Sequence, residues 1–125
     1  MALDHDPILG SRLIVERVVR GRSSLFVVDP EKKEVTKIGS GIGQEQAPYW
    51  ATSNRIYFSA DYDGIYNIYS MLPDGTDLMR HTSVIGGAFE PYVDEETQTL
   101  YFSEYTASGF RIASVPLTGS VYAIA

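Results

Sequence analysis

The chain alternates between short apolar runs and clusters of turn-forming residues. In the middle of the sequence the apolar runs fall at about 47–50, 55–60, 65–71 and 77–82, with the segments TSN, DYDG and PDGT between them. Asn, Asp, Gly and Pro are the residues that tight turns require. Gly or Pro interrupts most windows before a helical period can develop. The pattern therefore predicts short β-strands and no convincing helix.

The apolar runs do not alternate cleanly with polar residues. IYF, IYNIY and LFVV place apolar or aromatic side chains on both faces of a strand. A sheet with one face in water would show strict alternation. We therefore expect these strands to be covered on both sides.

One long stretch of the sequence occurs nearly twice. RIYFSADYDGIYNIYSMLPDG at 55–75 matches TLYFSEYTASGFRIASVPLTG at 99–119 with a constant offset of 44, and an offset of 43 carries the match back to Arg12. Three copies result, at about 4–46, 47–90 and 91–125, and each reads as four short strands. Four-stranded sheets repeated every 40 to 50 residues are typical of the blades of a β-propeller.

The middle copy carries a recognisable set of motifs. It has a Pro-aromatic start, an I-x-F-S strand, a D-x-D-G turn, a strand NIYSM, an Asp-Gly turn and a final R-H-T; these are PYW at 48–50, IYFS at 56–59, DYDG at 61–64, NIYSM at 67–71, DG at 74–75 and RHT at 80–82. Together they resemble the TolB-like propeller repeat, which is related to the propellers of prolyl-oligopeptidase-like and tricorn-like peptidases. The other copies depart from it, since Thr118-Gly119 and Arg20-Gly21 stand at two of the turns.

The resemblance implies an all-β fold in which 1–125 is a TolB-like propeller segment of about three four-stranded blades. Such a segment is either half of a six-bladed ring or a fragment of a longer propeller. Three blades form an open arc, and the two end blades would each expose an apolar face. We therefore expect either self-association through the open end blades or completion of the ring by further chain.

Composition and charge limit the partners. The formal net charge is −6, which argues against nucleic acid or an anionic membrane surface as the main partner. The chain has no cysteine, and no run of apolar residues is long enough to span a bilayer. No signal peptide is visible at the N-terminus. The resemblance implies a periplasmic or otherwise extracytoplasmic location, and a cytoplasmic one stays open.

Four candidate sites are each better explained structurally. SADYDG at 59–64 resembles the start of a calcium loop but lacks the downstream ligands, so a hairpin turn is favoured. GSGIG at 39–43 opens no helix and has no P-loop lysine, so it is a connection between blades. His5 and His81 form no metal signature or triad, and His81 is assigned to a surface or edge position. Glu95-Glu96 belong to a charged turn. We expect no catalytic residue, no metal and no cofactor.

The remaining candidate is a binding surface formed by turns and connections of the blades. In each blade, the connection to the next blade and the turn between the second and third strands emerge on one face. That face is predicted to carry acids, amides and aromatics suited to a basic or polar protein partner: Gln44, Glu45, Gln46, Asp61, Tyr62, Asp63, Phe89, Glu90, Glu104 and Tyr105.

The leading hypothesis is a non-enzymatic protein-binding or assembly module, whose partner the resemblance places in the cell envelope. One alternative is the gating propeller of a serine peptidase whose catalytic domain lies outside this chain. A second alternative is a carbohydrate-binding propeller that stacks sugars on Trp50 and the tyrosines.

Overall fold

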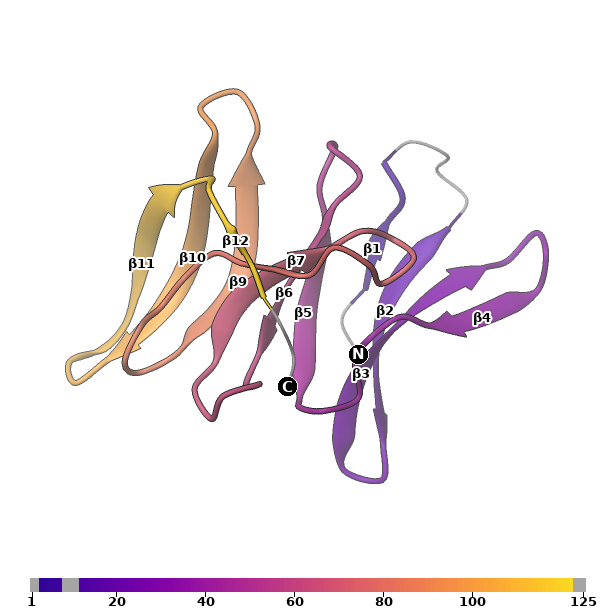
Figure 1. Cartoon of the computed structure of the whole chain (residues 1–125), viewed down its shortest axis with the longest axis horizontal. Helices are drawn as coiled ribbons and strands as arrows, with labels where there is room; N and C mark the ends of the chain where they lie inside the picture. Colours follow the sequence, from indigo (N-terminus) through magenta and orange to yellow (C-terminus); the bar gives the residue numbers. More distant parts are fainter. Residues whose placement is uncertain (1–2, 8–11, 123–125) are drawn as a thin grey trace.

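The predicted strands form three antiparallel sheets that stand side by side (Figure 1). The structure is a computed structural model that describes residues 3–7 and 12–122. Within these residues it contains strands and turns, and none of them forms a helix that could cross a membrane. The all-β class is therefore confirmed. The strands are β1 (Leu3–His5), β2 (Leu13–Val19), β3 (Arg22–Asp29), β4 (Glu34–Lys37), β5 (Glu45–Trp50), β6 (Ile56–Ala60), β7 (Asn67–Met71), β8 (Met79–Arg80), β9 (Ala88–Asp94), β10 (Thr99–Thr106), β11 (Gly109–Pro116) and β12 (Ser120–Val121).

Apart from β12, each sheet is built from consecutive strands, as expected for propeller blades. We call the sheet β1-β2-β3-β4 blade 1, the strands β5 to β8 blade 2, and the sheet β9-β10-β11 blade 3. Neighbouring strands pair antiparallel throughout, with full register between β10 and β11 from Thr99↔Pro116 to Thr106↔Gly109. Short antiparallel hairpins of this kind need only local turns to form.

The turns explain why glycine stands where it does. Arg20 and Gly21 join β2 to β3 with φ of 53° and 77°. Positive φ at both central residues defines the type I′ hairpin turn, which matches the right-handed twist of the flanking strands. Ala47 and Glu90 are 43 residues apart and have φ of 54° and 55°. Ala47 lies where the pairing of β5 with β6 shifts register, and Glu90 lies where the pairing of β9 with β10 does. The repeat therefore conserves a β-bulge in the first strand of two blades.

Two apolar clusters hold the blades together. The first lies between blades 1 and 2 and contains buried side chains from both, including Ile14, Leu25 and Phe58. The second lies between blades 2 and 3 and includes Ile68 and Phe102. All residues of β6 and β7 are buried. The prediction that these strands are covered on both sides is confirmed for blade 2.

The end of the third copy departs from the expected pattern. The repeat predicts a fourth strand beside β11, but β12 instead pairs with β8, at Ser120↔Arg80 and Val121↔Met79. The segment crosses back over the outer edge of blade 2 (Figure 1). Tyr122 then packs against the first cluster, where its ring lies 5.0 Å from that of Tyr69. Blade 3 is left with three strands and blade 2 has five.

Candidate functional site

The turns and connections predicted to share one face do so. Along the lower edge of Figure 1 lie the turns at 20–21, 61–66 and 107–108 and the connection at 38–44. Backbone hydrogen bonds tie neighbouring segments of this edge together: Asp61 N donates to Gln44 O (3.3 Å), and Tyr105 N, near the end of β10, donates to Gly87 O (3.0 Å) in the connection before β9. We call this surface the loop face.

Gln44 and Asp61 hold the loop face together. The Gln44 amide N–H donates to Asp61 Oδ1 at 2.7 Å, and the Gln44 side-chain oxygen accepts from Ser23 N at 2.7 Å. Gly64, with φ of 94°, donates its N–H to Asp61 O at 2.8 Å. The interpretation of SADYDG as a turn is therefore confirmed. Among residues 3–7 and 12–122, no group of three or more His, Asp or Glu side chains is arranged to hold a metal ion.

One of the predicted surface residues, Glu45, lies inside the protein, so this part of the prediction is wrong, and Tyr62 is half-buried. Glu45 is fully buried, and its Oε2 accepts hydrogen bonds from Ser40 N (3.0 Å), Ser40 Oγ (3.2 Å) and the Tyr62 hydroxyl. Burial, reinforced by the Glu45 carboxylate, raises the pKa of Tyr62 well above its usual range, so the phenol keeps the proton that it donates. Tyr62 also packs against the first cluster, beside Phe58. Both residues bind blade 1 to blade 2.

The remaining predicted residues do reach the surface. Asp63, Glu90 and Tyr105 are exposed, and Gln46, Phe89 and Glu104 are half-buried. Two of the acids have cationic neighbours: Asp63 pairs with Arg80 at 2.7 Å and Glu104 with Arg111 at 2.9 Å. Exposed ion pairs of this kind contribute little to stability, so their carboxylates can exchange partners at small cost.

The loop face of blade 3 is hollowed. A depression of about 340 Å³ lies between the 81–87 connection and the β10–β11 turn. Its lining includes Ile85, Tyr105 and Glu104. The Tyr105 ring contacts that of Phe110 at 5.0 Å, edge to face. The hollow thus combines apolar walls with a carboxylate, which suits a partner that presents an apolar group beside a positively charged or hydrogen-bond-donating one.

Trp50 is not a surface platform. It is buried in the first cluster, and its indole N–H donates to Asn54 Oδ1 at 2.9 Å. The guanidinium of Arg12 lies 5.2 Å above the ring. Sugar stacking on Trp50, which the carbohydrate hypothesis invokes, is therefore contradicted.

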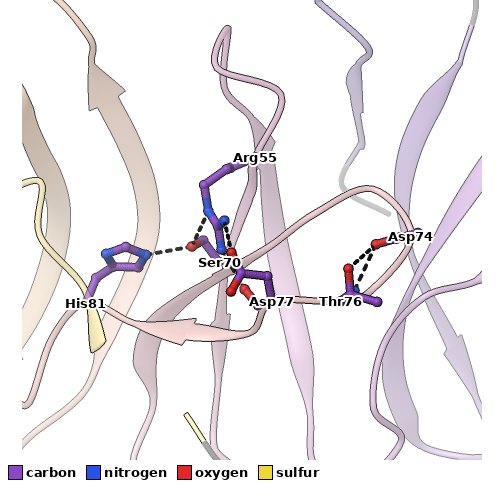
Figure 2. Close-up of polar contacts among 6 residues, drawn as sticks. All are labelled: Arg55, Ser70, Asp74, Thr76, Asp77 and His81. Atoms are coloured by element: carbon purple, nitrogen blue, oxygen red, sulfur yellow. Dashed lines mark hydrogen bonds and ion pairs between the residues drawn. The ribbon is translucent and has the colours of Figure 1, made fainter. Parts of the chain in front are cut away.

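At the outer edge of blade 2, the buried Ser70 links the half-buried Arg55 and His81 in a row of hydrogen bonds that was not predicted from the sequence (Figure 2). Arg55 Nε donates to Ser70 Oγ at 3.0 Å, and Ser70 Oγ lies 2.6 Å from His81 Nε2. His81 Nδ1 lies 2.9 Å from the carbonyl oxygen of Thr118, which can only accept. Nδ1 therefore carries the proton, and the Ser70 hydroxyl donates to Nε2. His81 directly follows β8, at the predicted outer edge of the four consecutive strands of blade 2, but its side chain is half-buried.

The serine–histidine pair resembles a nucleophile and its base, but its setting is structural. Ser70 has no exposed surface, so a substrate cannot reach its hydroxyl in this structure. The group that orients His81 is the Thr118 carbonyl, not a carboxylate. The pair anchors the crossing segment, in which Gly119 lies so close that an added Cβ would stand 2.7 Å from the imidazole ring. Ser70, which the repeat aligns with Ser114, and Arg55, which it aligns with Arg12, were the available sequence signals.

Burial lowers the pKa of His81 below its ordinary value of 6.5, and the nearby Arg55 charge lowers it further, while the bond to Thr118 acts in the opposite direction. The folded protein therefore favours the neutral imidazole. As pH falls below 6.5 the unfolded chain binds a proton before the folded one does, so His81 makes stability decrease toward acid.

Three adjoining sheets of this kind define a β-propeller segment. The chain is similar to a putative TolB from Agrobacterium tumefaciens, with a TM-score of 0.79 and 17% identity over 94% of this chain and 48% of that one. It is also similar to TolB from Acinetobacter baumannii, with a TM-score of 0.69 and 14% identity over 90% of this chain and 29% of that one. The tricorn protease gives a TM-score of 0.61 with 20% identity, over 92% of this chain and 12% of that one. The predicted TolB-like propeller fold is confirmed.

One curated protein adds a sequence match. Tricorn protease homolog 1 of Streptomyces coelicolor is 36% identical over 63 residues, which is 50% of this chain. This chain spans 6% of that homolog and about half of the putative TolB. No family model matches the sequence.

Proposed function

We propose that this segment is a non-enzymatic protein-binding module whose loop face receives a partner with a basic or polar surface. The hollow lined by Ile85, Tyr105 and Glu104 carries the proposal, because it offers an apolar pocket beside a carboxylate. The exposed carboxylates of Asp63 and Glu90 belong to the same face. The net charge of −6 supports electrostatic steering of a cationic partner toward it.

Selection from a phage-displayed peptide library on the immobilised chain tests this function. We expect enrichment of peptides that place an apolar or aromatic residue beside Lys or Arg. The double variant Glu90→Lys with Glu104→Lys should weaken their binding by about tenfold or more, with a stronger loss at low salt. Glu31→Lys, in the turn between β3 and β4 and away from the loop face, is the matched control. Equal weakening by the control, or enrichment of peptides without basic residues, would contradict the proposal.

A second candidate function is that of an access propeller attached to a peptidase. The 36% identity with the tricorn protease homolog and the likeness to the tricorn protease favour it. In that case a catalytic domain lies elsewhere in the parent protein, and this segment would filter substrates. Peptide hydrolysis by the parent protein, lost on substitution of a serine outside this segment, would support the peptidase context. An inactive parent would argue against it.

We also propose an extracytoplasmic location, on the strength of the likeness to TolB structures alone. Cell fractionation with an antibody against this segment tests it. Recovery of the protein with cytoplasmic markers would refute it.

A further inference from the structure

The outward face of blade 3 is apolar and uncovered. Large exposed side chains lie on the face of β9, β10 and β11 opposite blade 2: Tyr92 (56% exposed), Tyr101 (37%), Tyr105 (49%), Phe110 (66%) and Ile112 (80%). The ring of Tyr92, on β9, also lies 5.5 Å from that of Tyr49 on blade 2. The strand register confirms that these exposed side chains share a face. Tyr101 on β10 pairs with Tyr92 on β9, and Tyr105 on β10 pairs with Phe110 on β11. Aromatic side chains gathered in this way mark an interaction surface.

The repeat identifies what this face is built to contact. Tyr101 and Ile112 correspond, 44 residues earlier, to Tyr57 and Ile68 of blade 2. Those two side chains are 3% and 0% exposed, because they pack against blade 3 in the second cluster. The outward face of blade 3 therefore repeats the face with which blade 2 packs on its successor.

Blade 1 carries the complementary half. Its outward face is formed by Leu13, Val15, Phe26, Val28 and Val35, which the register places together through Leu13↔Val28, Val15↔Phe26 and Val28↔Val35. An offset of 43 aligns them with Ile56, Phe58, Tyr69, Met71 and Leu78 of blade 2. All five of these blade 2 residues belong to, or pack against, the first cluster beside blade 1.

The two end blades thus carry the two halves of the interface that already joins neighbouring blades inside the chain. On blade 1, Val35 is exposed, Leu13, Phe26 and Val28 are half-buried and Val15 is buried. We propose that two copies of this chain associate head to tail, with blade 3 of each packed on blade 1 of the other, and so complete a ring. The contact is heterologous and occurs twice, which is how a closed ring forms from such contacts.

Sedimentation of the purified 125-residue chain at micromolar concentrations tests the proposal. We expect a mass of two chains for the wild type. Ile112→Arg on blade 3 and Val35→Arg on blade 1 (80% and 60% exposed in the single chain) should each sediment as a monomer with unchanged circular dichroism. Ile42→Arg, at an exposed position in the 38–44 connection outside both end faces, is the matched control and should remain dimeric.

Mixing the two variants separates the head-to-tail arrangement from others. A heterodimer of Ile112→Arg with Val35→Arg keeps one interface in which both partners are wild type, whereas each homodimer has no intact interface. The mixture should therefore recover dimer that neither variant forms alone. A monomeric wild type would overturn the proposal. A dimer that Val35→Arg leaves intact would overturn it as well, since it would indicate blade 3 packed on blade 3.

Discussion

Replacing Phe58 by alanine would remove the side chain at the centre of the contact between blades 1 and 2. Phe58 is fully buried in the first cluster, with its ring 6.2 Å from that of Tyr69 and 6.3 Å from that of Tyr62. Phe→Ala changes in protein cores cost about 3–5 kcal/mol, and the cost is larger where the surroundings cannot collapse into the cavity. Hydrogen-bonded sheets flank the site on both sides, so we expect a value near the top of that range.

Urea unfolding followed by circular dichroism measures this loss. With a slope of about 2 kcal/mol per molar urea, a loss of about 4 kcal/mol lowers the midpoint by about 2 M. Phe58→Leu, which keeps most of the volume, should cost less than about 1.5 kcal/mol. Ile85→Ala, at a position 92% exposed, should stay within about 0.5 kcal/mol of the wild type. All variants need the same protein concentration, because association shifts apparent stability. A Phe58→Ala cost below about 1 kcal/mol would show that blades 1 and 2 do not pack as described.

Three further predictions concern the residues around blade 2. His81→Gln should remove part of the acid sensitivity of folding: the stability advantage of the wild type should shrink between pH 6.5 and pH 5, by at most about 1.4 kcal/mol per pH unit, and a constant difference across that window would contradict the inferred neutral imidazole. Gly39→Ala would place a Cβ 1.8 Å from the buried Glu45 Oε1, so urea unfolding should show a loss of about 1–3 kcal/mol, and an unchanged midpoint would refute the close approach. Arg80→Cys with Ser120→Cys should form a disulfide under mild oxidation, because the two are cross-strand partners in a chain without other cysteines; persistent free thiols in the folded protein would argue against the pairing of β12 with β8.

The strands of the middle copy were predictable because their turn residues and apolar runs are both local signals. The expected runs at 47–50, 55–60 and 65–71 overlap β5, β6 and β7. The run at 77–82 contains β8, but only Met79 and Arg80 form ladder pairs there. Coverage of both strand faces was also predictable from the sequence. Successive side chains of a strand point to opposite faces, so apolar neighbours in sequence, such as Tyr57 and the residues beside it, need apolar surroundings on both faces.

Burial within the loop face was not predictable from residue type. Glu45 and Tyr62 look like surface residues, yet Glu45 is fully buried and Tyr62 half-buried, because blade 1 packs against this end of blade 2. The Glu45 Oε2 accepts from Ser40 and Tyr62, so hydrogen bonds compensate the burial of that oxygen, whereas the buried Oε1 has no hydrogen-bond partner among the described residues. The two partners come from separate segments, Ser40 from the connection before β5 and Tyr62 from the turn after β6, and no local pattern encodes their meeting.

The path of β12 was the largest departure, and the anchoring contacts in blade 2 show what keeps a fourth strand on its own blade. Arg55, just before β6, pairs with the Asp77 carboxylate at 2.8 Å and donates to the Asp77 backbone oxygen at 2.7 Å (Figure 2). Asp74 fixes the turn by accepting from Thr76 N at 3.0 Å and Thr76 Oγ1 at 2.6 Å. The turn after β7 is thereby tied back to β6, and β8 follows beside β7.

Blade 3 lacks every one of these ties. At an offset of 44, Thr99 stands in place of the arginine, Thr118 in place of the turn aspartate and Val121 in place of the paired aspartate. Nothing of that kind returns the chain to β11, and the Thr118 carbonyl is instead taken by His81 on the neighbouring blade. The backbone then satisfies its hydrogen bonds along β8, where an edge was open. A repeat that has kept its apolar positions but lost its polar anchors therefore still builds its sheet, while the strand that closes it becomes free to pair elsewhere.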